Sequence, residues 1–145
     1  MSYHTWITYG YGVRTDNIKV KSLEALQKLI ALAPLAEEDF KNWFEENNIG
    51  NPTIEDYYEY DDNDGCNLAA ILRMVILETE GVELTACNNF SDQDFLLYEP
   101  LYPWGLTEID KTITKEKLES IFCKYLSMIT ENVPEFGYQE AENGG

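Results

Sequence analysis

The stretch from Gly65 to Gly81 constrains the fold more than any other part of the chain. Its apolar side chains recur at helical spacing and cover almost the whole circumference of the predicted helix. They are Leu68, Ala69, Ile71, Leu72, Met74, Val75, Ile76 and Leu77. A helix with so little polar surface must be buried, so this segment predicts the centre of the core. Asp64 or Asn67 is expected to cap its start, and Gly81 to end it.

Other segments predict helices around this central one. Each combines an apolar stripe with a start or stop signal, such as the N-cap residues Ser22, Thr53 and Thr114 or the helix breaker Pro34. In the shortest, Asp56 stands at the capping-box position after Thr53. These helices are expected within residues 22–34, 37–50, 53–60 and 114–134.

Three further segments predict strands that pair in one sheet. Tyr3 to Val13 is rich in aromatic and β-branched residues and is expected to be a central strand. Gly10 and Gly12 share one face of it, where a crossing helix is expected to approach the backbone. Val82 to Cys87 and Asp94 to Glu99 predict an antiparallel hairpin that turns through residues 88–93. Residues 136–139 can add an edge strand.

Together these elements predict an α+β fold in a single domain, residues 1–145. A small antiparallel sheet of about three to four strands packs against four or so helices. The aromatic loop from Leu101 to Gly105 is expected to cover an edge of the core. Residues 141–145 are small and polar and are expected to form a frayed tail.

The charge of the chain is strongly negative and unevenly distributed. The formal net charge is −17, and residues 35–110 hold 19 acids against two bases, Lys41 and Arg73. A nucleic-acid-binding protein needs basic groups to replace the counterions of the phosphates. Direct binding of DNA or RNA is therefore disfavoured, and a basic protein partner is favoured.

The cysteines and the apolar runs indicate the compartment. Cys66, Cys87 and Cys123 are odd in number and lie in apolar patterns, which favours reduced, buried thiols over a disulfide framework. No apolar run approaches the ~20 residues that span a bilayer, and the N-terminus lacks a leader pattern. A cytoplasmic protein without a membrane segment is expected.

The sequence contains no motif for a known catalytic chemistry. With His4 as the single histidine, and without a nucleophile elbow, a phosphate-binding loop or paired zinc-binding cysteines, neither an enzyme nor a cofactor is predicted. The loop carboxylates Asp61, Asp62 and Asp64 leave a loose calcium or magnesium site open as an alternative, since hard oxygens suit these ions. A metal-assisted enzyme using this loop is the corresponding functional alternative.

The most distinctive candidate site is the acidic and aromatic stretch 55–64. Its carboxylates and tyrosine rings resemble the phosphates and bases of a nucleic acid, so arginine and lysine of a partner can meet them instead. The candidate partner-binding residues are Glu55, Asp56, Tyr57, Glu59, Tyr60, Asp61, Asp62 and Asp64. The alternative is a solvated acidic face that only keeps the protein soluble.

A resemblance favours the first interpretation. In size, charge, the opening Ser2–Gly12 and the ending Glu140–Gly145, the chain resembles small acidic proteins of phages and mobile elements in Gram-positive bacteria. Among these it is similar to anti-CRISPR proteins and other DNA mimics. The resemblance implies a non-enzymatic inhibitor that blocks a basic nucleic-acid-binding surface of a bacterial defence protein, such as a CRISPR effector. The alternative is a module that binds a small ligand, such as a signalling nucleotide, in an aromatic pocket near Trp6, Tyr9 and Trp104.

Overall fold

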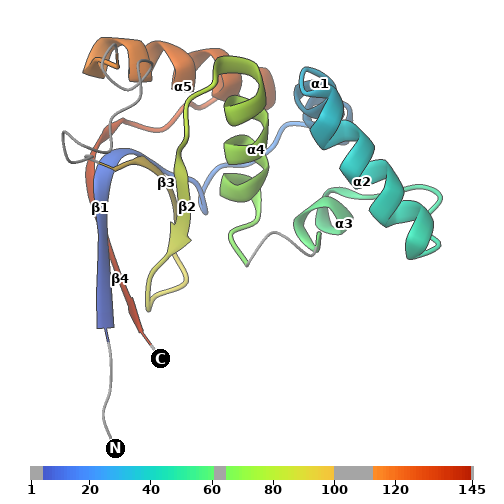
Figure 1. Ribbon diagram of the computed structural model, residues 1–145, viewed down its shortest axis with the longest axis horizontal. Coiled ribbons are helices and arrows are strands. Elements are labelled where there is room, and N and C mark those ends of the chain that lie inside the picture. The colour runs from blue at the N-terminus through green and yellow to red at the C-terminus, as the bar shows by residue number, and fades with distance from the viewer. Residues whose placement is uncertain (1–4, 61–64, 100–112, 145) are drawn as a thin grey trace, which may run out of the picture.

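The computed structural model describes residues 5–60, 65–99 and 113–144, and its organising element is helix α4 (Leu68–Glu80). Helix α4 lies between the sheet and the helices of residues 23–58 (Figure 1). Its buried side chains are Leu68, Ala69, Ala70, Ile71, Leu72, Val75 and Ile76. The predicted central helix is therefore confirmed, and Gly81 ends it in a left-handed conformation with φ of 70°. Asn67 precedes it without a side-chain capping bond, and Asp64 lies outside the described residues.

The described ranges contain four more helices. They are α1 (Leu23–Ala31), α2 (Pro34–Glu46), α3 (Ile54–Tyr58) and α5 (Lys115–Ile129). The predicted caps Ser22, Thr53 and Thr114 all accept a hydrogen bond from a backbone N–H of the first turn. Pro34 is the first residue of α2, where its missing N–H costs no intrahelical bond. The chain therefore turns from α1 into α2 within two residues, 32 and 33.

The strands form one antiparallel sheet in the order β2-β3-β1-β4. Their bounds are β1 (Thr5–Arg14), β2 (Thr85–Asn88), β3 (Asp94–Tyr98) and β4 (Gly137–Gly144). The predicted central position of β1 is confirmed, as is the hairpin of β2 and β3. The described residues combine this sheet with five helices, so the mixed α+β class is confirmed.

The predicted frayed tail is wrong for residues 141–144, which belong to β4. Ala141 pairs with Thr8 of β1 and is only 2% exposed. The turn between β2 and β3 also holds this strand, because the backbone N–H of Phe90 donates to the carbonyl of Glu142 at 3.0 Å. In addition, the Asn143 side chain donates to the Oδ1 of Asn88 at 2.6 Å. The two outer strands thus meet at one end, so the sheet is strongly curled.

The curl explains the two glycines of β1. A Cβ atom placed on Gly12 would lie 2.0 Å from the carbonyl oxygen of Leu96, and one on Gly10 would lie 2.6 Å from that of Tyr98. The close approach therefore comes from strand β3, and the expectation of a helix that crosses at these glycines is wrong. The same face of the sheet carries a small second core of Phe95, Leu97 and Ala141.

The three cysteines differ in their exposure. Cys66 is buried and Cys87 is half-buried, but Cys123 is exposed, and none of the three forms a disulfide. The prediction of buried thiols is wrong for Cys123, because it lies on the exposed side of α5, opposite the buried stripe of that helix. In the parts of the chain that are described, no helix combines the length and apolarity needed to cross a bilayer.

Candidate functional site

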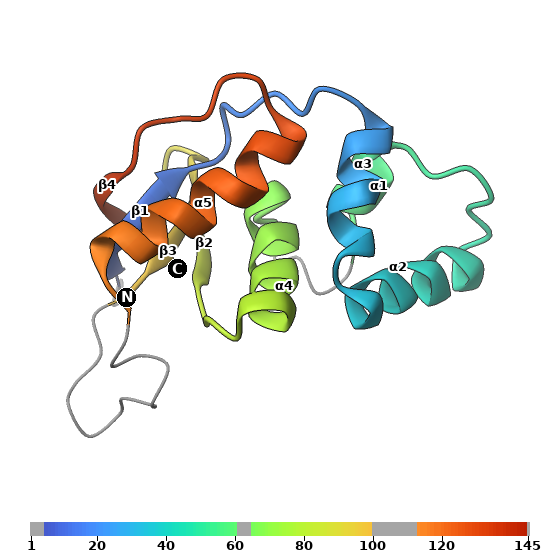
Figure 2. The ribbon, with the colours of Figure 1, turned by 90° about the horizontal axis from the view of Figure 1, so that it is seen from above.

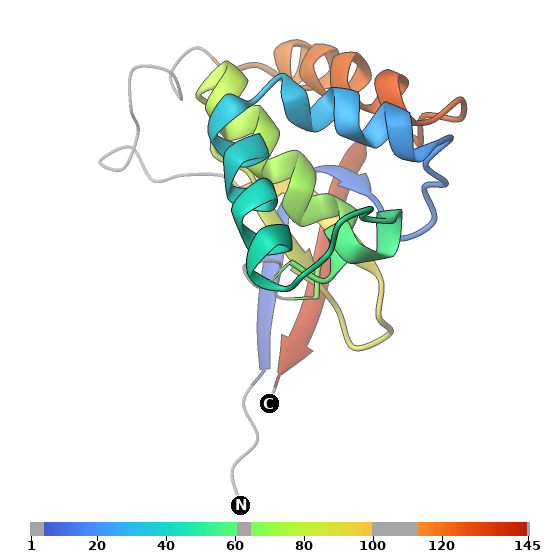
Figure 3. The same ribbon diagram turned by 90° about the vertical axis from the view of Figure 1, so that its right-hand side faces the viewer.

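Residues 34–60, which contain α2 and α3, carry a high density of exposed carboxylates and are called here the acidic unit. This range holds eight acids and one base, Lys41. Seven of the acids are exposed: Glu37, Glu38, Asp39, Glu45, Glu46, Glu55 and Glu59. The unit lies at the end of the molecule away from the sheet (Figure 2), and Figure 3 shows this end from the front.

Helix α2 is oriented by an apolar face and by a cap from another helix. Ala36, Phe40 and Phe44 are buried and recur every turn, so the carboxylates between them face outward. At the start of α2, the carboxylate of Glu78 in α4 accepts hydrogen bonds from the backbone N–H groups of Leu35 and Ala36, both at 3.0 Å. This contact satisfies two of the free donors at the helix N-terminus.

Helix α3 is held by the predicted capping box. The Thr53 hydroxyl accepts from the backbone N–H of Asp56 at 3.3 Å, and the Asp56 carboxylate accepts from the backbone N–H of Thr53 at 2.8 Å. The Asp56 carboxylate is therefore occupied within the chain. Glu55 and Glu59 are exposed one helical turn apart, and they remain available to a partner.

The tyrosines of the stretch stabilise the unit. Tyr57 is 7% exposed, and its ring centroid lies 4.8 Å from that of Phe44. Half-buried Tyr60 packs against Phe40 at 4.6 Å and against Trp43 at 5.7 Å. Of the candidate partner-binding residues, Tyr57 is therefore not on the open surface: its ring belongs to the core between α2 and α3, where it lines the pocket described below.

The remaining predicted site residues, Asp61, Asp62 and Asp64, lie outside the described residues. Within the described ranges, no group of three or more histidine, cysteine, aspartate or glutamate residues could hold a metal ion. The structure adds α2 carboxylates that the candidate list omitted, such as Glu45 and Glu46. Their signal was already present in the excess of acids over residues 35–110.

Several carboxylates in other parts of the molecule bind partners within the chain. Glu80 accepts from the Tyr125 hydroxyl at 2.5 Å and pairs with Lys124 at 3.2 Å, and these contacts lower the pKa of its carboxyl group. Asp16 pairs with Arg14 at 2.7 Å, which lowers its pKa in the same way. None of the seven exposed carboxylates of the acidic unit has a hydrogen bond or ion pair of this kind within the described residues.

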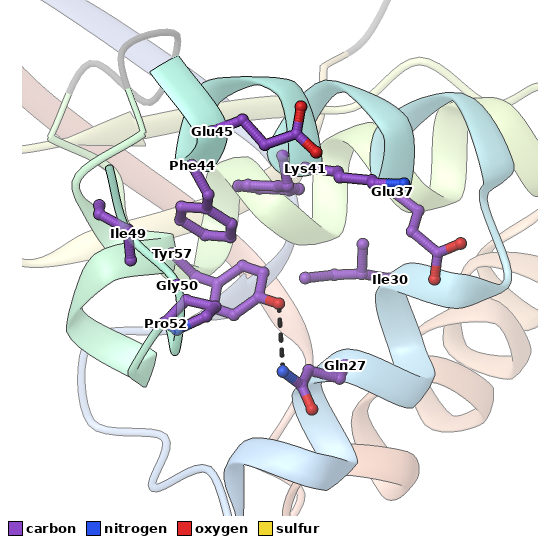
Figure 4. Close-up of a pocket in the computed structure, with 11 residues that line it drawn as sticks. Gln27, Ile30, Glu37, Lys41, Phe44, Glu45, Ile49, Gly50, Pro52 and Tyr57 are labelled. Atoms are coloured by element: carbon purple, nitrogen blue, oxygen red, sulfur yellow. Dashed lines mark hydrogen bonds between the residues drawn. The ribbon is translucent and has the colours of Figure 1, made fainter. Parts of the chain in front are cut away.

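A pocket of about 540 Å³ opens in the acidic unit between α1, α2, α3 and residues 49–52 (Figure 4). Phe40, Phe44 and Tyr57 are among its apolar lining residues. At one end, the amide of Gln27 donates to the Tyr57 hydroxyl oxygen at 3.3 Å. Along α2, three charged side chains border the pocket one turn apart: Glu37, Lys41 and Glu45.

The aromatic pocket expected near Trp6, Tyr9 and Trp104 is not formed by the first two residues. Trp6 and Tyr9 are three residues apart in β1. Successive side chains of a strand alternate between the two faces of the sheet, so these two point to opposite faces. Trp104 lies outside the described residues. Tyr9 instead stacks on Tyr138 of β4, with ring centroids 5.7 Å apart.

Comparisons of the chain with protein-family models, with curated proteins and with solved structures find no match. The functional argument therefore rests on the geometry and charge of the acidic unit.

Proposed function

We propose that this protein is an acidic, non-enzymatic inhibitor that acts as a DNA mimic. It occupies a basic nucleic-acid-binding surface of a partner protein through the acidic unit. The resemblance to anti-CRISPR proteins directs this proposal to a bacterial defence protein, such as a CRISPR effector, with a phage or mobile element as the source.

The observation that carries the proposal is the set of seven exposed carboxylates in residues 34–60, which have no hydrogen-bond or ion-pair partner among the described residues, against Lys41 as the one base of that range. A carboxylate and a phosphate offer the same type of acceptor to arginine and lysine. A surface that binds a phosphate backbone can therefore bind this unit. The unit carries a net formal charge of −7, which would also accelerate the encounter with a basic protein.

The rigidity of the unit supports the same proposal. The ring cluster of Phe40, Phe44, Tyr57 and Tyr60 fixes α2 against α3, and the cap from Glu78 fixes the start of α2. The carboxylates are therefore presented from helices that are already formed. Such preorganisation lowers the entropy lost on binding.

The proposal is tested by recovering partners from a bacterial lysate with three versions of the immobilised protein. The first is the parent chain. The binding variant combines Glu45→Gln, Glu46→Gln, Glu55→Gln and Glu59→Gln. The charge control combines Glu83→Gln, Glu131→Gln, Glu135→Gln and Glu140→Gln, which are exposed carboxylates outside the unit.

The parent and the charge control should recover the same basic nucleic-acid-binding protein, identified by mass spectrometry, and the binding variant should lose it. Recovery should fall as the wash salt is raised, because charge pairs at an interface are screened. If both variants lost the partner equally, the recovery would depend only on the overall charge of the protein and not on the acidic unit. An empty pull-down with the parent would argue against the inhibitor.

A further inference from the structure

The pocket of the acidic unit combines an apolar interior with a negative border. Its interior is built by aromatic and aliphatic side chains from four segments, including Ile30 of α1 and Ile49 of the loop before α3. The aromatic rings pack on each other, with the centroids of Phe40 and Tyr57 5.2 Å apart. The walls are therefore fixed before any ligand binds.

The border selects the charge of the ligand. Glu37 and Glu45 lie on either side of Lys41, and all three side chains are exposed and form no ion pair within the described chain. The net charge of this border is negative, so an anionic ligand such as a nucleotide is disfavoured. A purely apolar ligand would cover carboxylates without pairing them, at a cost in desolvation. A ligand with an apolar stem and a cationic head satisfies both parts of the pocket.

Among such groups, the guanidinium of arginine fits better than the ammonium of lysine. It is planar and weakly hydrated, stacks on aromatic rings, and pairs with a carboxylate through two parallel hydrogen bonds. The volume of about 540 Å³ lies within the roughly 300–1,000 Å³ of ligand pockets. It leaves room for an apolar residue next to the arginine.

We propose that this pocket binds an arginine side chain, together with a neighbouring apolar residue, from the basic surface of the partner. The aliphatic stem lies against Phe44 and Tyr57, and the guanidinium meets Glu37 or Glu45 at the border. The source of the arginine rests on the proposed function. The preference for arginine over lysine rests on the pocket alone.

The test uses blocked tripeptides, so that the partner need not be known. Acetyl-Leu-Arg-Leu-amide is titrated into the full ¹⁵N-labelled protein and followed by NMR, and acetyl-Leu-Lys-Leu-amide carries the same charge as a control. The arginine peptide should give saturable shifts at the amide signals of Lys41, Gly50 and Tyr57. Its affinity should exceed that of the lysine peptide by about fivefold or more, the fold-change of a modest bidentate gain.

Variants locate the binding within the pocket. The pair Glu37→Gln and Glu45→Gln should weaken the arginine peptide by about tenfold, because the charge-assisted bonds are lost. The matched pair Glu38→Gln and Glu46→Gln removes the same charge from positions that do not line the pocket and should change affinity less than about twofold. Gly50 lines the pocket, and a Cβ there meets no atom within 4 Å, so Gly50→Leu should fold normally and obstruct binding.

Equal binding of the two peptides, equal losses in the two carboxylate pairs, or full binding to Gly50→Leu would each overturn the arginine pocket. These results are separate from the proposed function. A protein that recovers a basic partner but ignores the arginine peptide would overturn only the pocket. One that binds the peptide at the pocket but recovers no basic partner would overturn only the inhibitor.

Discussion

Two groups of carboxylates on opposite sides of α4 differ in their contacts. Towards the sheet and α5, Glu80 binds Tyr125 and Lys124, Asp16 binds Arg14, and Glu119 accepts a hydrogen bond from Tyr11. In the acidic unit, Glu45 and Glu59 are exposed and bind nothing in the described chain. The first group connects elements of the fold, whereas the second group contributes repulsion to it. The difference indicates which carboxylates folding requires and which are available for recognition.

The two sides also differ in how tightly the backbone is packed, and glycine substitutions should reveal this with the largest effect. Gly12→Ala brings a Cβ within 2.0 Å of the Leu96 carbonyl, so it should cost about 3 kcal/mol or more of stability, at the upper end for overpacking. Gly50→Ala, in the acidic unit, meets no atom within 4 Å and should change stability by less than about 0.5 kcal/mol. Denaturant unfolding measures both. A tolerated Gly12→Ala would contradict the close pairing of β1 and β3.

A pair of glutamate substitutions compares the two groups of carboxylates directly. Glu80→Gln removes the charge that Tyr125 and Lys124 contact at 2.5 and 3.2 Å, and it should cost about 1–2 kcal/mol at pH 7. Glu46→Gln should leave the free energy of unfolding within about 0.5 kcal/mol of the parent value. Since these contacts lower the pKa of Glu80, its contribution should disappear as the pH falls through that lowered pKa. Equal effects of the two substitutions would remove the distinction.

Asp94 is the exception on the sheet side and gives a smaller effect of opposite sign. Burial, followed by the charges of Asp16 and Asp92, raises its pKa from 3.8 to about 6. A raised pKa in the folded state means that this group favours folding below pH 3.8, and that this contribution is lost as the pH rises through about 6. Asp94→Asn should therefore raise stability at pH 7 by about 1 kcal/mol, less than the full shift implies, because the amide must also be desolvated.

Unfolding of the Asp94→Asn variant should be compared with that of the parent at several pH values. The gain should disappear below about pH 4, where the parent carboxyl is protonated in both states. A gain that is independent of pH would contradict the raised pKa.

Local patterns predicted most of the fold. The period of the central helix, the caps Ser22, Thr53 and Thr114, and the hairpin of residues 82–99 all depend on neighbouring residues, and the structure confirms them. Contacts between segments that are distant in the sequence could not be predicted in this way. The composition of residues 141–144 suggests fraying, and only pairing with β1 and with the β2–β3 turn orders them. Likewise, the partner of Gly12 is a strand far along the chain.

The candidate site was predictable only in part. Charge counting located the acidic region, and Glu55 and Glu59 are exposed as expected. Tyr57 is buried because Phe40 and Phe44 of α2 lie against it, a contact that no local pattern contains. The pocket beside it is built by α1, α2, α3 and a loop, so its lining could not be assembled from spacing along the sequence.

The central claim is that the carboxylates of the acidic unit compete with nucleic acid for a basic surface. The most direct measurement is displacement of a fluorescent DNA duplex from the recovered partner, followed by anisotropy as the protein is added. The parent and the charge control should displace the DNA at the same concentration, and the binding variant should need at least about tenfold more. Equal displacement by all three proteins, or DNA and protein bound together without competition, would contradict the claim.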